Sequence, residues 1–314
     1  MKRLAVIALG GNSLIHDHQK GTVSDQEHNV NDTCRDLLAL VRRDYNLVIG
    51  HGNGPQVGNI ILSNIAGYKM FDLPDMPLDI DVAYSQGFIG IMIEQQFRNV
   101  LAENKIHREI LTIVTQVIVD KNDTAFKHPT KPVGPFYTKE EIEKLARETN
   151  SVFAEDPRGR GWRKVVPSPK PLTICNAPII GRLAREGTIV IAAGGGGIPA
   201  TYDEQKGLEG VDAVIDKDLA LALLAVTIKA EEFYILTDVP KVCLHFNTPQ
   251  EKTLDVITVS EAQKYLDEGH FSEGSMAPKI RAAIQFVRNG GKETVITESQ
   301  QLNKKGAGTT IVHD

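Results

Sequence analysis

The sequence is poor in several features that mark particular classes of protein. Three of its 314 residues are cysteines, Cys34, Cys175 and Cys243, and their wide separation indicates a reducing compartment and argues against a disulfide framework or a zinc site. No apolar run reaches the length of a membrane-spanning helix, so we expect a cytoplasmic protein without membrane contacts. The formal net charge of −5 argues against a general nucleic-acid-binding protein.

Several catalytic motifs are also missing. The phosphate-binding pattern GxxxxGK[ST] has its nearest fragment in GKE at 291–293, which does not match, and HExxH, CxxC and GxSxG do not occur. A dinucleotide fingerprint through Gly195, Gly197 and Ala200 fails because the polar segment after it has no amphipathic helical stripe. The nine histidines form no ligand pattern, so we assign no metal-binding residue.

What the sequence does contain is three apolar strands that end in glycines. They are LAVIALGGN (residues 4–12), LVIGHGNGPQVG (47–58) and TIVIAAGGGGIP (188–199). Pro55 suits the first position of a helix that follows the second strand. Such strand ends expose backbone N–H groups close to electropositive helix N-termini, which favours an anionic, phosphorylated ligand. The alternative is that each glycine run is only a tight turn.

The order of the segments predicts the fold class. Hydrophobic residues make up 41% of the chain, which argues against disorder, and its length suits one large or two medium domains. Strands alternate with amphipathic helices as far as Asp120, which predicts an α/β fold with a mainly parallel sheet covered on both faces. Residues 121–171 hold seven of the fifteen prolines, and we expect a protruding insertion that is either a lid or an inert excursion.

Local patterns place the other elements. Ser24 and Glu27 have the spacing of a capping box before an amphipathic helix, and acidic residues near Asp216 favour a helix start there. Further helices are expected after Pro55, from about Asp81, and over 138–147, 176–185, 216–230, 260–268 and 275–289. Strands are expected over 110–120, 211–215, 233–239, 294–297 and 309–314.

Four side chains are candidates for chemistry. Lys131 lies in the insertion, Lys217 stands where a strand becomes a helix, and Lys279 lies in the first turns of a helix, where its charge opposes the helix dipole. Each lysine alone has a solvated surface position as its alternative, but together with the glycine loops they favour phosphoryl transfer. His51 is either a base or a structural histidine that packs against a glycine loop.

Seven motifs carry a family resemblance and occur in the order ALGGN (8–12), HGNGPQVG (51–58), PTKPVGPFY (129–137), AAGGGGIP (192–199), AVIDKD (213–218), LTDV (236–239) and SMAPKI (275–280). Over essentially the whole chain they resemble the carbamate kinases of the amino acid kinase family. Other members of that family usually carry a lysine just before the first glycine pair, where this chain has Ala8 and Leu9. The resemblance implies that Lys131 supplies the missing charge. Ser13 stands where alanine is usual.

The resemblance also implies an architecture. It predicts an open αβα sandwich with a mainly parallel central sheet and a small protruding insertion. Residues 1–210 would form an N-terminal lobe that binds carbamate or carbamoyl phosphate and carries the subdomain at about 121–171. Residues 211–314 would form a C-terminal lobe that binds the nucleotide. The family forms homodimers.

The resemblance assigns roles to individual residues. Catalytic roles fall to Lys131, Lys217, Asp218 and Lys279, with Asp218 holding the lysines in place. Substrate binding falls to Gly10, Gly11, Asn12, Gly52, Asn53, Gly54, Gly194 and Gly195. Nucleotide binding falls to Gly196, Asp216, Thr237, Asp238, Val239 and Met276.

By resemblance, the reaction is reversible phosphoryl transfer from ATP to carbamate, which gives ADP and carbamoyl phosphate with Mg²⁺, and its setting is arginine catabolism. A carbamate oxygen is already anionic, so the reaction needs positioning and charge neutralisation but no general base. The alternatives are a kinase for another small acid and a non-catalytic nucleotide or metabolite sensor of the same fold. Sensors tend to lose such charges, so the intact lysines argue against the second alternative.

Overall fold

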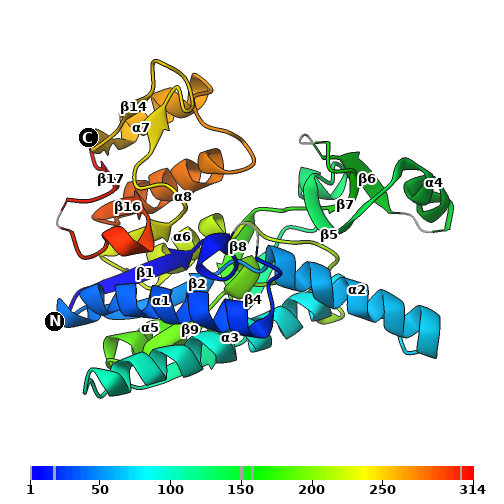
Figure 1. Ribbon diagram of the computed structural model, residues 1–314, viewed down its shortest axis with the longest axis horizontal. Coiled ribbons are helices and arrows are strands. Elements are labelled where there is room, and N and C mark those ends of the chain that lie inside the picture. Colours follow the sequence, from blue (N-terminus) through cyan, green and yellow to red (C-terminus); the bar gives the residue numbers. More distant parts are fainter. Residues whose placement is uncertain (1, 17–18, 149–150, 157–158, 305) are drawn as a thin grey trace.

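The computed structural model describes residues 2–16, 19–148, 151–156, 159–304 and 306–314. At its centre lies one sheet of eight strands in the order β15-β17-β16-β12-β1-β2-β9-β3 (Figure 1). In that order the strands are Val256–Thr258, Thr309–Val312, Glu293–Thr297, Glu232–Leu236, Leu4–Leu9, Asn46–His51, Ile189–Ala192 and Ile110–Ile113. Neighbouring strands are parallel except β16 and β17, so the prediction of a mainly parallel sheet is confirmed.

Helices cover both faces of this sheet. One face carries α1 (Val23–Arg42) and α3 (Leu78–Glu103), and the other carries α5 (Ala177–Arg185), α6 (Lys217–Thr227), α7 (Val259–Asp267) and α8 (Met276–Arg288). Strand β1 shows why both faces need a cover: successive side chains of a strand point to opposite faces of the sheet, and those of β1 are apolar on both. Its odd-numbered residues, Ala5 to Leu9, join the core under α1 and α3, and its even-numbered residues, Leu4 to Ala8, join the opposite core. The αβα sandwich is therefore confirmed.

A second sheet continues from the edge of the first. Its order is β11-β10-β4-β8, and its strands are Gly207–Gly210, Ile198–Asp203, Gln116–Val119 and Pro171–Ile174. The single strand expected over 110–120 is wrong, because it divides into β3 in the main sheet and β4 in the second. The break has a tertiary cause. The Gln86 side chain accepts from the Thr115 N–H at 2.8 Å, and the Thr115 hydroxyl accepts from the Ala193 N–H at 3.1 Å.

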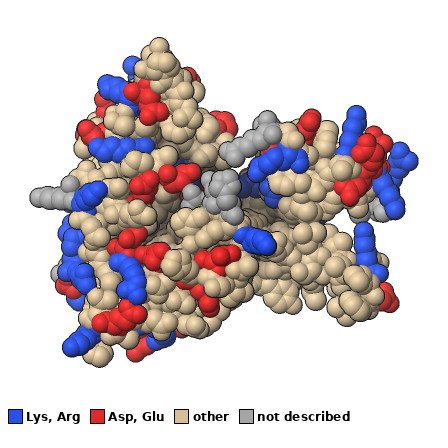
Figure 2. Space-filling view, in the orientation of Figure 1, with Lys and Arg blue, Asp and Glu red and all other residues tan. Residues whose placement is uncertain are grey.

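The insertion forms a small subdomain that projects from the body, next to the long helix α2 (Gly54–Phe71) (Figure 1). It consists of an antiparallel sheet in the order β5-β7-β6, whose strands are Lys131–Tyr137, Trp162–Val166 and Val152–Glu155, and of helix α4 (Lys139–Glu148). Charged side chains of both signs gather at its outer end, over α4 (Figure 2). Its base is anchored, because Val133 and Val166 share a buried cluster with Val57 of α2 and Val214 of the body.

Short elements complete the described chain. They are the hairpin β13 (Cys243–Leu244) and β14 (Lys252–Thr253), and the 3₁₀ turns η1 (Gly11–Ser13), η2 (Thr124–Phe126), η3 (Gly194–Gly196) and η4 (Ser299–Gln301). Within the described residues, no helix combines the length and the apolar character needed to cross a bilayer.

Two local predictions are wrong. The capping box of α1 is formed by Thr22 and Asp25, whose side chains bond each other's backbone N–H groups at 3.2 and 3.0 Å, and Ser24 and Glu27 do not form it. Residues 211–215, all described, form no strand. Ala213, Val214 and Ile215 are apolar and buried because this part of the segment crosses the interior, where the Val214 N–H bonds the Pro167 carbonyl at 3.0 Å.

Candidate active site

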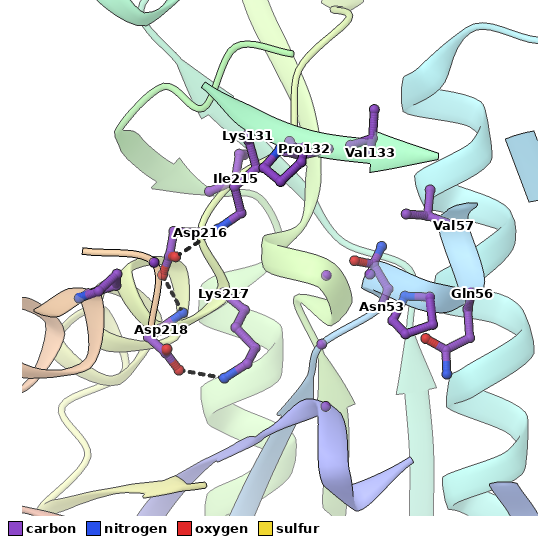
Figure 3. Close-up of a pocket in the computed structure, with 18 of the residues that line it drawn as sticks. Asn53, Gln56, Val57, Lys131, Pro132, Val133, Ile215, Asp216, Lys217 and Asp218 are labelled. Atoms are coloured by element: carbon purple, nitrogen blue, oxygen red, sulfur yellow. Dashed lines mark hydrogen bonds and ion pairs between the residues drawn. The ribbon is translucent and has the colours of Figure 1, made fainter. Parts of the chain in front are cut away.

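A cavity of about 410 Å³ lies where the carboxyl ends of β1 and β2 meet the starts of α6 and α8 and the base of the subdomain (Figure 3). This is the place at which open α/β sheets bind their ligands. Of the predicted residues, it is lined by Gly11, Gly52, Asn53, Gly54, Lys131, Gly195, Asp216, Lys217, Asp218 and Lys279. The four predicted catalytic residues, which are up to 148 positions apart in the sequence, therefore share one cavity with all three glycine loops.

The first two glycine loops owe their shape to close backbone contacts. A Cβ atom on Gly10 would lie 2.7 Å from the Leu236 carbonyl oxygen, so a side chain there would separate the ends of β1 and β12. In the second loop, α2 begins at Gly54 with Pro55 in its first turn, as expected, and the Gly52 N–H bonds the Leu9 carbonyl at 3.2 Å. The side chain of the predicted residue Asn12 lies outside the described part of the structure.

The third glycine loop closes on the second through His51. A Cβ atom on Gly194 would lie 2.3 Å from the His51 Nε2, and Gly195 has a φ of +65°, which favours glycine. His51 is 1% exposed, and its Nδ1 lies 2.8 Å from the Gly52 carbonyl oxygen. Burial lowers the pKa of His51 to about 4, and the positive charge of Lys217 contributes in the same direction. A neutral, enclosed ring favours the structural interpretation of this histidine over the base.

Asp218 connects two of the three lysines. The Lys217 Nζ lies 2.6 Å from its Oδ1, and the Lys279 Nζ lies 3.0 Å from its Oδ2. The side chains are 14%, 12% and 4% exposed for Lys217, Lys279 and Asp218. Burial alone would raise the pKa of Asp218, but the two ammonium groups reverse this and lower it to about 2. Two positive charges and one negative charge leave a net positive charge at the cavity, which suits an anionic ligand.

The third lysine reaches the cavity from the subdomain. Lys131 is the first residue of β5, and its Nζ lies 3.3 Å from the Oδ2 of Asp216 (Figure 3). The other oxygen of Asp216 caps helix α6 by accepting from the N–H groups of Asp218 and Leu219 at 3.0 and 3.3 Å. In this structure Asp218 thus holds Lys217 and Lys279, and Asp216 is the partner of Lys131.

A second cavity of about 530 Å³ lies beside the first. It contains the predicted residues Asp238, Val239 and Met276, and Ser275 borders both cavities. The sequence reasoning missed its other lining residues, Lys241, Cys243, His245, Phe246, Gly269, His270, Phe271 and Ser272. The apolar and aromatic residues in the loops that flank β13 and precede α8 were the feature of the sequence that could have indicated this cavity. Two cavities that share Ser275 in their lining suit a ligand with a ring at one end and phosphates at the other.

Some predicted residues line neither cavity within the described part of the chain. They are Gly10, Gly194, Gly196 and Thr237. A Cβ atom on Gly196 would lie 2.3 Å from the Ile215 carbonyl oxygen, so this glycine permits a close backbone approach. The Thr237 N–H bonds the Thr297 carbonyl at 2.9 Å and extends the pairing of β12 with β16. In the first cavity the sequence reasoning missed Gln56, Ile215 and Ser275, among others.

Comparison with known proteins identifies relatives over nearly the whole chain. The profile of the amino acid kinase family matches residues 3–298. The carbamate kinase of Pyrococcus horikoshii is 48% identical over 310 residues, which cover 99% of this chain and 98% of the relative. That of Thermococcus kodakarensis is 50% identical over 311 residues, with the same coverage. The solved structure of the Giardia lamblia carbamate kinase bound to AMP-PNP is 42% identical, with a TM-score of 0.93 and coverage of 100% of this chain and 99% of the other.

Proposed function

The chain belongs to the amino acid kinase family, and we propose that it acts as a carbamate kinase, which transfers a phosphoryl group reversibly between ATP and carbamate. The observation that carries this function is the pair Lys217 and Lys279, held by the buried Asp218 at the edge of three glycine loops. This arrangement supplies fixed positive charge and backbone donors where a phosphoryl group would be transferred.

The reaction requires little acid–base chemistry of the protein. A carbamate oxygen attacks the γ-phosphorus of ATP, the bond to the bridging oxygen of ADP breaks, and carbamoyl phosphate forms without a net proton transfer. Charge develops on the equatorial and leaving oxygens of the phosphoryl group. Lys217 and Lys131 would neutralise this charge, and Lys279 would bind the nucleotide phosphates. The low pKa of His51 and its enclosure agree with a site that lacks a general base.

The substrates would occupy the two cavities. Gly11, Gly52 and Gly54 would direct backbone N–H groups to the carbamate and the transferred phosphoryl group. The adenine ring would enter the second cavity, between Met276 and the aromatic residues there, with its phosphates passing Ser275. The AMP-PNP bound to the Giardia relative supports the use of adenine nucleotides.

Mg²⁺ would arrive as a complex with the nucleotide. Among the described residues, no three histidine, cysteine, aspartate or glutamate side chains form a metal-binding group. Mg²⁺ characteristically keeps several waters and binds substrate phosphates together with one or two carboxylates. Asp216, which faces the cavity, is the side chain best placed to contact it.

We further propose a homodimer. Strand β3 ends the strand order of the main sheet, and Leu111 within it and Val114 just after it are exposed. Tyr84 and Ile91 of the neighbouring helix α3 are also exposed. An apolar surface beside an unpaired sheet edge favours association with a second copy. Light scattering that shows a monomer at micromolar concentration would contradict this arrangement.

Further proposals concern organisation and cellular role. Residues 1–210 would bind the carbamoyl substrate and residues 211–314 the nucleotide, although both halves contribute strands to one sheet. If so, ADP should protect the C-terminal half from proteolysis, and protection confined to residues before Asp120 would contradict this division.

A cytoplasmic location and a role in arginine catabolism are also proposed, from the composition and the family resemblance.

The decisive assay is ATP formation from ADP and carbamoyl phosphate, with acetyl phosphate as the control donor. A carbamate kinase should use carbamoyl phosphate efficiently and acetyl phosphate poorly. Efficient use of acetyl phosphate alone would favour a kinase for another small acid. A lack of turnover with both donors, in a protein that binds ADP, would favour a sensor.

A further inference from the structure

The donor and acceptor groups around the first cavity are unevenly distributed. Three lysines and the backbone N–H groups of the glycine loops are donors, and a carbamoyl group offers them oxygen atoms. The carboxylates of Asp216 and Asp218 also line the cavity, but their oxygens are already bonded to these lysines and to the start of α6. A carbamoyl group, however, also carries an NH₂ group, which is itself a donor and needs an acceptor. Acetyl and other small acyl groups lack this donor. A site that selects carbamate therefore needs an acceptor placed among its donors.

The amide of Asn53 has its orientation determined by Ser85. The Ser85 Oγ lies 2.6 Å from the Val82 carbonyl oxygen, which can only accept, so the hydroxyl hydrogen is donated there. The oxygen of Ser85 is left to accept, and it accepts from the Asn53 Nδ2 at 2.8 Å. The Asn53 side chain must therefore direct its NH₂ group toward Ser85 and its carbonyl oxygen away from it.

The carbonyl oxygen of Asn53 faces the cavity (Figure 3). Within the described part of the chain, this oxygen has no hydrogen-bond partner, whereas the Nδ2 is bonded to Ser85. The amide also has little room to turn, because it packs over Gly195. A Cβ atom on that glycine would lie 2.2 Å from the Asn53 Nδ2. Ser85 itself is fully buried on α3, so its hydroxyl holds a fixed position from which it orients the amide of Asn53.

Helix α3 fixes the neighbouring loop in the same way. Gln86 follows Ser85, and its Nε2 donates to the Gly194 carbonyl oxygen at 2.9 Å. Consecutive residues of one helix thus hold the second and third glycine loops. The orientation of Asn53 is therefore part of a rigid support and does not depend on a surface contact.

We propose that Asn53 accepts a hydrogen bond from the amino group of the carbamoyl substrate, and that Ser85 is the positioning residue that turns the Asn53 carbonyl toward it. This inference rests on the proposed function and adds the basis of its selectivity to it. A bound acetyl group would leave this acceptor unpaired in an enclosed site, which lowers its reactivity relative to a carbamoyl group. Asn53 thus acts as an acceptor for the substrate, in addition to the donors first expected of this loop.

The test compares kcat/KM for carbamoyl phosphate and for acetyl phosphate, both with saturating ADP. In Ser85→Ala the amide of Asn53 loses the hydrogen bond that orients it. The preference for carbamoyl phosphate should therefore fall about 3- to 10-fold, the scale of one ordinary hydrogen bond. The kcat/KM for acetyl phosphate should stay within about twofold, because no contact with that donor is lost. Ser85→Thr keeps the hydroxyl and should keep the preference.

Ser63→Ala is the matched control, because Ser63 also donates to a carbonyl of its own helix, at 2.9 Å, but lies exposed on α2. Asn53→Leu removes the acceptor itself and should lower the preference at least as much as Ser85→Ala does. An equal loss with both donors in Ser85→Ala would assign a purely structural role to Ser85 and overturn the inference. An unchanged preference in Asn53→Leu would overturn it even if Ser85→Ala did not fold. Absence of ATP formation from carbamoyl phosphate by the unmodified protein would instead contradict the proposed function.

Discussion

Two regions bring a positive charge to the same cavity by different means. Lys217 belongs to the body, is 14% exposed and is paired at 2.6 Å with the buried Asp218, which also binds Lys279. Lys131 belongs to the projecting subdomain, is 44% exposed and forms an ion pair, at 3.3 Å, with Asp216. The first charge is part of the interior of the fold. The second depends on where the subdomain lies.

This difference separates permanent charge from charge that depends on conformation. A buried ion pair is weakly screened and is oriented before any substrate arrives. A partly exposed ion pair contributes less to stability than a buried one, so Lys131 can leave Asp216 for a phosphate at a modest cost. The base of the subdomain is nevertheless packed against the body through Val133 and Val166. Any movement of the subdomain would therefore pivot about this base. We therefore propose that Lys217 acts as a preorganised stabiliser and Lys131 as a charge completed by closure.

The largest expected effect is on turnover in Lys217→Ala. Loss of one preorganised electrostatic group should lower kcat by roughly 10²–10³-fold. Lys206→Ala is the control, because Lys206 lies in the turn between β10 and β11, is 70% exposed and forms an ion pair with Glu209. Steady-state kinetics with saturating substrates measures the effect, and thermal melting verifies the fold. Near-normal turnover with unchanged melting would remove Lys217 from the mechanism.

The next effect concerns stability at acid pH. It tests whether the carboxylate of Asp218 is held by Lys217 and Lys279 in the folded protein. Asp218 has a folded-state pKa of about 2, below the value near 4 of an unfolded aspartate. A lowered pKa stabilises the fold above pH 4, and this contribution is lost as the pH falls toward 2. The difference in unfolding free energy between the unmodified protein and Asp218→Asn should therefore shrink by about 2–3 kcal/mol from pH 5 to pH 2.

Urea unfolding at several pH values measures this difference. Asp44→Asn is the control, because Asp44 is 70% exposed and pairs with Lys2 at the surface. Its difference from the unmodified protein should vary little with pH. An equally flat curve for Asp218→Asn would mean that the carboxylate is not held by the two lysines.

A smaller effect is expected at the base of the subdomain. Asp81 is 3% exposed beside a cavity of about 250 Å³ between α2, α3 and the subdomain, and burial raises its pKa to about 6. Asp75, Asp212 and Asp79 contribute in the same direction, whereas the hydrogen bond from Asn64 opposes it. Lys164 of the subdomain lines the same cavity.

A raised carboxyl pKa destabilises the fold as the pH rises from about 4 through 6. Asp81→Asn should therefore be more stable than the unmodified protein at pH 7.5, by about 1–2 kcal/mol, and should lose most of this advantage at pH 4.5. Denaturant unfolding at the two pH values measures the change. An advantage that is equal at both pH values would show that the charge of Asp81 is not its cause.

The parts of this molecule that depend on periodicity could be predicted from its sequence. The alternating strands and helices, and the glycines at three strand ends, follow from local rules that hold wherever the segment lies. The break between β3 and β4 could not, because it depends on Gln86 and Thr115 meeting across the fold. The second cavity could not either, since irregular loops bring Phe246 and His270 together with no periodic signal. The lysines were found by their unusual contexts, but their partners required the structure.

We propose that one cavity combines a charge fixed in the body with a charge delivered by the subdomain. Measuring kcat and the Kd for ADP on the same preparation of Lys131→Ala tests this combination. We expect kcat to fall at least about tenfold, the scale of one charge-assisted hydrogen bond, and the Kd for ADP to change less than about twofold. Turnover at the parent rate with saturating substrates would contradict the role of the subdomain. A fall in kcat matched by an equal loss of ADP affinity would mean that Lys131 binds the nucleotide and does not complete the site.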